Sequence, residues 1–94
     1  MSNYVITKYS FDKARELGLS IKVSKKKLKK IDVYTNNGVF LACIGDSRYN
    51  DYPHYCIIYN EKYANKRKLL YHNRHKKNSD VKYSKQWLAL NLLW

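Results

Sequence analysis

Apolar residues recur with two different spacings along this chain, and the two spacings predict strands in some segments and helices in others. In the segment KIDVY, Ile31 and Val33 alternate with other residues and share one face of a predicted strand. The dipeptide NG at positions 37–38 tolerates positive φ and predicts a tight turn into the return strand VFLACIG. A two-residue turn there pairs Ile31 with Ile44. It also pairs Val33 with Ala42.

The N-terminal part of the chain predicts one helix and one further strand. Residues 1–18 form a helical segment, in which Ser10 caps FDKARELGL and Gly18 lies just past the helix end. A short strand is expected at residues 21–23, next to the hairpin.

The second half of the chain predicts one strand and two helices. The segment HYCIIY, at residues 54–59, is apolar or aromatic at five of its six positions and is expected to be a strand. Residues 61–77 are expected to form a basic helix. Ser84 caps a final helix over residues 84–94, which is apolar almost all round and is expected to pack into the rest of the fold.

These elements predict an α+β fold. A small antiparallel sheet, made of the β-hairpin plus a further strand, packs against two or three short helices. The chain has 94 residues, which corresponds to a single domain over residues 1–94. Its two cysteines, Cys43 and Cys56, are too few for a disulfide framework and predict a reducing compartment.

The charge balance narrows the class of partner. The sequence has 19 lysine and arginine residues against 7 aspartate and glutamate residues, a net charge of +12. Such an excess attracts polyanions, of which nucleic acid is the commonest, and DNA is expected ahead of RNA. The chain has no run of about 18 apolar residues and no signal peptide, so neither a membrane nor secretion is expected.

Two groups of residues are candidates for contacting phosphates. The first is a basic loop over residues 25–30, in which five of the six residues are lysines. Their mobile ammonium groups can reach phosphates without reading base sequence, and the alternative is a solvated loop that only aids solubility. These residues are Lys25, Lys26, Lys27, Lys29 and Lys30.

The second group lies on the basic helix, which places Arg67 and Arg74 within its apolar stripe, two turns apart. A buried guanidinium needs a carboxylate, and Asp51 is the preferred partner, which predicts a structural ion pair between Asp51 and Arg67. Alternatively, the stripe is open, and Arg67, Tyr71 and Arg74 present a shallow surface that forks onto phosphates and stacks on bases. The nucleic-acid-binding candidates on this helix are Lys66, Arg67, Lys68, Tyr71, Arg74, His75, Lys76 and Lys77.

Metal and catalytic sites are not expected. The close pairs His54-x-Cys56 and His72-x-x-His75 do not have the spacing of structural zinc sites. The seven acidic residues are scattered, and none of the three glycines lies in a phosphate-binding loop motif. The sequence therefore predicts no cofactor, no metal, no catalytic residue and a non-enzymatic role.

Several segments occur together in a fixed order: the hairpin KKIDVY…G…IG, then RYNDYPHY, YANKRKLLYHNRH and the closing LLW. This order resembles a family of small basic uncharacterised proteins encoded by large DNA viruses of the giant-virus group and by some tailed phages. The likeness covers residues 17–94. The family has a second arginine beside the one matching Arg67, where this chain has Lys66 or Lys68, and often a glycine near the position of Arg48.

Charge and resemblance together predict a small non-enzymatic viral nucleic-acid-binding protein, which contacts phosphate backbones electrostatically and serves genome condensation or packaging. A second hypothesis is a virion structural component, a minor capsid or cement protein whose partners are capsid proteins. A third is a host-directed effector that binds an acidic host protein. The expected location is the virion or the interior of the host cell, in the cytoplasm, the nucleus or a viral factory.

Overall fold

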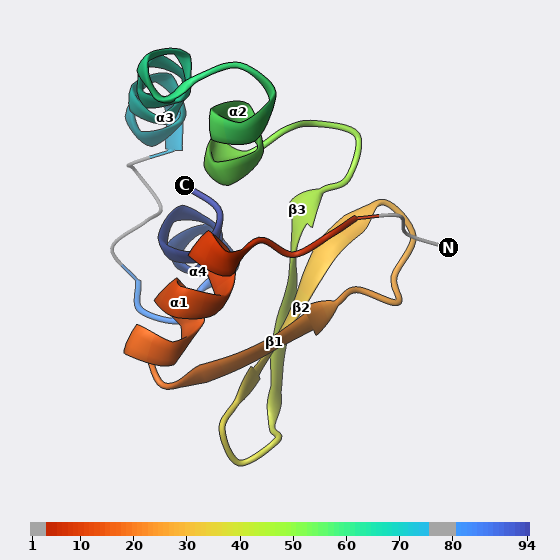
Figure 1. Cartoon of the computed structure of the whole chain (residues 1–94). Helices are drawn as coiled ribbons and strands as arrows, with labels where there is room; N and C mark the ends of the chain where they lie inside the picture. The colour runs from red at the N-terminus through yellow and green to blue at the C-terminus, as the bar shows by residue number, and fades with distance from the viewer. Residues whose placement is uncertain (1–3, 76–80) are drawn as a thin grey trace.

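A three-stranded antiparallel sheet forms one layer of the fold, and four helices gather on one side of it (Figure 1). The computed structural model describes residues 4–75 and 81–94. The strands, paired in chain order, are β1 (Leu19–Val23), β2 (Lys29–Thr35) and β3 (Phe40–Asp46). The helices are α1 (Lys8–Glu16), α2 (Tyr52–Ile58), α3 (Glu61–His75) and α4 (Lys85–Leu92). The predicted α+β class is confirmed, and the radius of gyration of 12.6 Å is close to the value of about 12 Å expected for a compact domain of this length.

The register of the β2–β3 hairpin is the one that the alternation predicts. Both apolar pairs, Ile31–Ile44 and Val33–Ala42, are present. The turn is longer than predicted, because a backbone hydrogen bond closes a loop over residues 36–38. A β-bulge directly after Val33 takes up the extra residue. The buried apolar pairs therefore set the register, and the turn adjusts to them.

Helix α4 closes the hydrophobic core, as predicted for the C-terminal helix. Ile31 of β2 and Leu88 and Leu92 of α4 are fully buried in one cluster. The Ser84 side chain accepts a hydrogen bond from the backbone N–H of Trp87, so the predicted N-cap is confirmed.

The first helix begins earlier than predicted. The N-cap of α1 is Thr7, whose side chain accepts a hydrogen bond from the backbone N–H of Ser10. Ser10 itself lies inside the helix, fully buried, where its Oγ donates to the Leu92 carbonyl oxygen at 2.7 Å. The prediction of Ser10 as the cap was wrong, because this hydroxyl ties α1 to α4 instead. Gly18 follows the helix end with φ +70°, as expected.

The segment HYCIIY is a helix, not the predicted strand. Asp51 caps α2 by accepting a hydrogen bond from the backbone N–H of His54, and Pro53 lies in the first turn. The apolar run misled the prediction because it is not buried: 72 % of Ile57 and 55 % of Ile58 are exposed. The cap and the proline were the stronger signals.

Two further sequence expectations concern membrane-spanning helices and disulfide bonds. Within residues 4–75 and 81–94, no helix is long and apolar enough to cross a membrane. Cys43 and Cys56 are both free thiols and partly buried.

Candidate functional site

A buried ion pair joins strand β2 to the start of α2. The Lys30 Nζ lies 2.9 Å from Oδ2 of Asp51, and the two residues are 3 % and 0 % exposed. The Tyr4 hydroxyl donates to the same carboxylate at 2.7 Å, and the His54 Nδ1 lies 2.7 Å from its other oxygen. The predicted ion pair between Asp51 and Arg67 was therefore wrong: Lys30 is the cation that Asp51 binds.

The pKa values of Asp51 and Tyr4 shift in the directions expected for an ionised carboxylate that accepts a hydrogen bond from a neutral tyrosine. Burial by itself raises the pKa of Asp51, but the charge of Lys30 and the surrounding hydrogen bonds outweigh it and lower the pKa below its ordinary value. Burial raises the pKa of Tyr4, and the charge of Asp51 raises it further. The cluster is thus an ionised carboxylate with its partners, and it fixes the segment before α2 against the sheet.

The structure divides the lysine-rich segment into two parts. Lys25, Lys26 and Lys27 are exposed in the β1–β2 connection, where ammonium groups can reach phosphates. Lys29 and Lys30 already belong to β2, so the basic loop is shorter than the predicted residues 25–30. The buried Lys30 is removed from the surface candidates.

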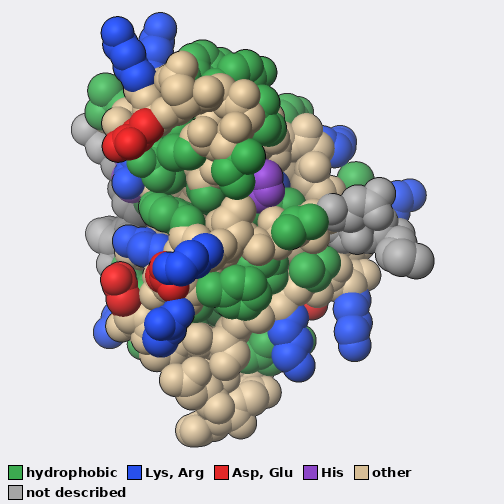
Figure 2. All heavy atoms as spheres, viewed as in Figure 1, with side chains coloured by type: hydrophobic (Ala, Val, Ile, Leu, Met, Phe, Trp, Pro, Cys, Tyr) green, Lys and Arg blue, Asp and Glu red, His purple; other side chains and the backbone are tan. Residues whose placement is uncertain are grey.

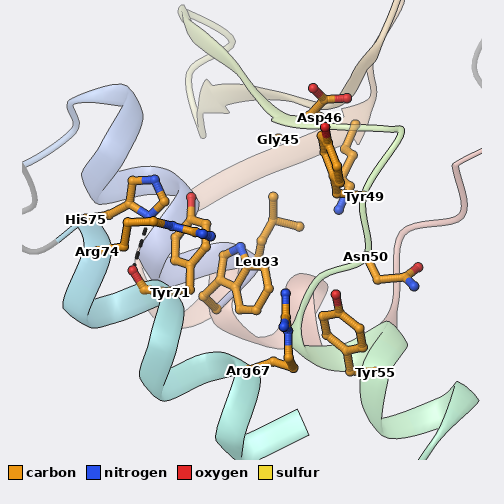
Figure 3. Close-up of a pocket in the computed structure, with 12 residues that line it drawn as sticks. Gly45, Asp46, Tyr49, Asn50, Tyr55, Arg67, Tyr71, Arg74, His75 and Leu93 are labelled. Atoms are coloured by element: carbon orange, nitrogen blue, oxygen red, sulfur yellow. Dashed lines mark hydrogen bonds between the residues drawn. The ribbon is translucent and has the colours of Figure 1, made fainter.

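A hollow of about 450 Å³ opens between α3 and the chain that follows β3 (Figure 3). Helix α3 contributes two arginines, and the segment 46–50 forms the wall on the other side. The C-terminal Leu93 and Trp94 form part of the floor. The remaining lining residues are Lys30, Gly45, Tyr55, Tyr71 and His75.

The two stripe arginines of α3 both reach this hollow, as Figure 3 shows. Arg67 is half-buried: its guanidinium carbon lies 5.5 Å from the centre of the Tyr55 ring, and its Nε is shielded from solvent with no hydrogen-bond partner in the part of the chain that the structure describes. Arg74 is exposed, with its guanidinium carbon 6.0 Å from the centre of the Tyr71 ring. Among the described residues, no carboxylate lies within ion-pair distance of either arginine.

The other charged residues around the hollow are already neutralised. Arg48 binds both oxygens of Asp46, through Nη2 at 2.7 Å and Nε at 3.0 Å. These hydrogen bonds lower the pKa of Asp46 to about 2, so it is a paired carboxylate at neutral pH. Lys30 is paired with Asp51. The uncompensated charge of the hollow therefore comes from Arg67 and Arg74.

The aromatic ring of Tyr71 serves packing. It stacks on the Trp94 ring, with 4.2 Å between the ring centres and 8° between the planes. The centre of the His75 ring lies 4.1 Å from the centre of the Tyr71 ring. The His75 Nδ1 lies 3.1 Å from the Tyr71 carbonyl oxygen, the contact dashed in Figure 3. Tyr71 and His75 thus shape the wall of the hollow, and Tyr71 is not the open base-stacking ring that the sequence suggested.

A second, smaller hollow of about 150 Å³ adjoins the first, because Gly45 and Tyr71 line both. It brings Lys29 of β2 beside Lys85 at the start of α4. Lys29 therefore faces the same region as the α3 arginines, unlike the exposed lysines of the β1–β2 connection. Lys85 was not among the sequence candidates.

The polar site residues that the sequence candidates lacked include Tyr49, Asn50 and Lys85. Tyr49 is 69 % exposed and lies on the segment between β3 and α2, where nothing in the local pattern sets it apart from the other tyrosines. Its position in the hollow results from the path of the chain around the Lys30–Asp51 pair. No spacing rule would have found it.

The remaining candidates on α3 are placed outside the larger hollow or outside the described chain. Lys66 is exposed, and the Lys68 Nζ lies 4.7 Å from the centre of the Tyr52 ring. Lys76 and Lys77 fall outside the described residues.

The cations do not form one continuous patch on the face that Figure 2 shows. Lysine and arginine side chains form separate groups on this face, some of them next to acidic side chains, and hydrophobic side chains lie between the groups. The β1–β2 connection and α3 also lie at opposite sides of the molecule in this view (Figure 1). The two hollows at Gly45 are therefore the best-defined place where cations from separate elements meet.

The described residues offer little for metal or nucleophilic chemistry. Over 4–75 and 81–94, no group of three or more histidine, cysteine, aspartate or glutamate side chains could hold a metal ion. Burial and the nearby Asp32 carboxylate raise the pKa of Cys43, which keeps this thiol protonated and weakly nucleophilic.

Comparisons with protein-family models, curated proteins and solved structures found no match for this chain.

Proposed function

We propose that the protein is a small, non-enzymatic nucleic-acid-binding protein that holds phosphates at the two adjoining hollows and through the exposed lysines at 25–27. The observation that carries the proposal is that Arg67 and Arg74 line one hollow and Lys29 and Lys85 line the adjoining one. Among the described residues that line the two hollows, the one acidic side chain is that of Asp46, which Arg48 already binds. Guanidinium groups fork onto phosphate oxygens, and ammonium groups add charge without reading bases.

The pairing of the acidic residues supports this proposal. Asp12, Asp46 and Asp51 each bind a cation of the same chain, and Asp32 lies within hydrogen-bond distance of Ser24. With 19 basic and 7 acidic residues in the chain, most lysines and arginines have no internal carboxylate to neutralise them. A surface of this kind attracts a polyanion over a distance set by the ionic strength.

The biological setting that we propose follows from the resemblance to small basic viral proteins. In a virus-infected cell or in the particle, a phosphate-binding domain of this size would condense or package the genome. Contact with phosphates alone makes binding insensitive to base sequence.

A salt series tests the proposed function. If about five phosphates are neutralised, the logarithm of the affinity for a random duplex should fall with the logarithm of salt concentration with a slope of about −4.5, and about −3.5 for a single strand. Fluorescence anisotropy with labelled oligonucleotides measures both slopes, and added Mg²⁺ in the same samples reveals any cleavage. Binding without salt dependence, or no binding at low salt, contradicts the proposal.

A second candidate function, a structural component of the virion, is favoured by the exposed apolar side chains at the end of α2. Ile57, Ile58 and Tyr59 are 72 %, 55 % and 57 % exposed and adjacent in the chain. Such a patch suits contact with another protein. Mass spectrometry of purified particles, before and after nuclease extraction, separates a shell component from a genome-bound one.

A further inference from the structure

The larger hollow combines cations with an exposed ring and a side-chain amide. Its volume of about 450 Å³ lies within the usual range of about 300–1,000 Å³ for small-ligand sites. Arg67 and Arg74 line one side, and Tyr49 and Asn50 line the other, as Figure 3 shows. Binding a phosphate backbone by electrostatic attraction needs only positive charge, whereas this surface also offers an aromatic ring and an amide.

We propose that this hollow binds one nucleotide, with its phosphate held between Arg67 and Arg74 and its base lying against the ring of Tyr49. The inference rests on the proposed function, because it names the unit of the nucleic acid that the hollow accepts. The inference also goes beyond the proposed function, because phosphate contacts alone would not distinguish unpaired from paired bases.

The arginines provide the phosphate end of the site. They lie seven residues apart on α3, which is about 10 Å along the helix axis and nearly the same direction around it. Both guanidinium groups lack a carboxylate partner among the described residues. The Nε of Arg67 is withdrawn from solvent, and in such partly desolvated surroundings an anion reaching the rest of the guanidinium is bound more strongly than in water.

Tyr49 provides the ring end of the site. The guanidinium carbon of Arg48 lies 5.9 Å from the centre of its ring, yet the residue is 69 % exposed, whereas Tyr71 is stacked on Trp94 and Tyr55 is only partly exposed beside Arg67. The Tyr49 backbone N–H donates to the Asp46 carbonyl oxygen at 3.1 Å, which ties the ring's backbone to the end of β3. An open aromatic ring stacks on any base.

Asn50 completes the ring end. A side-chain amide can both donate to and accept from the edge of a base, and that of Asn50, which points away from the arginines in Figure 3, has to turn toward the hollow to do so. A base inside a duplex is stacked on its neighbours and cannot enter such a hollow unless it is unpaired. The ligand is therefore a nucleoside phosphate that is free or part of a single strand, and this chemistry is the same in both sources.

Titration by calorimetry tests the site, with intrinsic fluorescence as a second readout because Trp94 lies in the hollow. The probes are a nucleoside 5′-monophosphate, the matching nucleoside, inorganic phosphate, a single-stranded tetranucleotide and a blunt duplex. The monophosphate is expected to bind more tightly than the nucleoside or inorganic phosphate alone. A tetranucleotide that binds at least ten-fold more tightly than the monophosphate identifies the strand as the source, and equal binding identifies the free nucleotide.

Two variants and two matched controls locate the binding. Arg74→Gln and Tyr49→Leu alter exposed side chains and should each weaken nucleotide binding about ten-fold, the loss expected for one charged hydrogen bond or one stacked base. Arg15→Gln and Tyr83→Leu alter exposed residues of the same types that do not line the hollow, and should leave the affinity unchanged. Circular-dichroism melting curves confirm that all four variants fold.

The outcomes separate the inference from the proposed function. Salt-dependent duplex binding that survives Arg74→Gln and Tyr49→Leu, together with no binding of the monophosphate, overturns the inference and leaves the proposed function standing. Binding of the monophosphate without binding of any oligonucleotide overturns the proposed function and leaves the nucleotide site standing. Equal affinity for inorganic phosphate and the monophosphate, unaffected by Tyr49→Leu, also overturns the inference, because the ring would then have no role.

Discussion

Replacing Lys30 by methionine should destabilise the fold strongly, because it leaves the Asp51 carboxylate buried without its cation. The two residues are 3 % and 0 % exposed, and methionine has nearly the shape of lysine without its charge. Removing one partner of a buried pair costs about 3–5 kcal/mol. Tyr4 and His54 still contact the carboxylate in the variant, so we expect a loss of unfolding free energy at the lower end of this range, about 3 kcal/mol.

The effect should depend on pH in a defined direction. In the wild type the folded-state pKa of Asp51 is lowered, so its contribution to stability is present above the unfolded pKa of about 3.9 and is lost as pH falls through the folded value. In the Lys30→Met variant burial is unopposed by that charge, so the pKa of Asp51 rises. Asp51 then takes up its proton at a higher pH in the variant than in the wild type. The stability difference between the two proteins should therefore be largest at pH 7 and shrink toward pH 4.

Urea denaturation followed by circular dichroism at pH 7, 5.5 and 4 measures this difference. Lys26→Met is the matched control, since Lys26 is exposed nearby, and it should change the unfolding free energy by less than about 0.5 kcal/mol. The double variant Lys30→Met/Asp51→Asn should be more stable than Lys30→Met alone, because asparagine keeps the α2 cap without the charge. A loss below about 1 kcal/mol at pH 7, or one that does not vary with pH, would refute the reasoning.

Three further outcomes are expected. Replacing the lysines at 25–27 by serine should leave the melting temperature unchanged and make the duplex salt slope about 2.7 units shallower, and an unchanged slope in the anisotropy assay would show that they do not touch phosphates. Gly45→Ala should lower the free energy of unfolding by more than about 2 kcal/mol, because φ is +78° and the added Cβ would lie 2.8 Å from Leu93 Cδ1. Gly38→Ala is the control: φ is +89° but the Cβ would lie in open space, so the loss in urea denaturation should be only about 1 kcal/mol. Arg67→Gln should change the unfolding free energy by less than about 1 kcal/mol, because no described carboxylate depends on it, and a loss of 3 kcal/mol or more would reveal an internal partner.

Much of the fold could be predicted because local rules and packing agreed. The alternation in β2 placed Ile31 and Val33 in the core, and the hairpin register followed from it. Ser84 capped α4 as expected. The helix α2 was missed because its apolar residues imitate a strand while its cap, Asp51, was assigned to an arginine. That assignment failed for a physical reason: Asp51 could bind any nearby cation, and linear sequence does not measure distance.

The candidate site was only partly predictable for the same reason. Arg67 and Arg74 could be placed on one stripe of a helix from spacing alone. Whether that stripe is covered depends on the path of the segment 46–50, which leaves a hollow over the arginines. Tyr49 and Lys85 reach the two hollows from other elements, and no pattern in the sequence links them to α3.

The sequence by itself determined the fold class of this protein, the register of its β2–β3 hairpin and its excess of positive charge, because these depend on composition and on the period of side chains along one element. The tertiary structure decided which cations are exposed. It buried Lys30 against Asp51, and it left Arg67 and Arg74 beside an open hollow without a described carboxylate partner. Ion pairing and burial are set by distances between elements, and those distances exist only once the chain has folded.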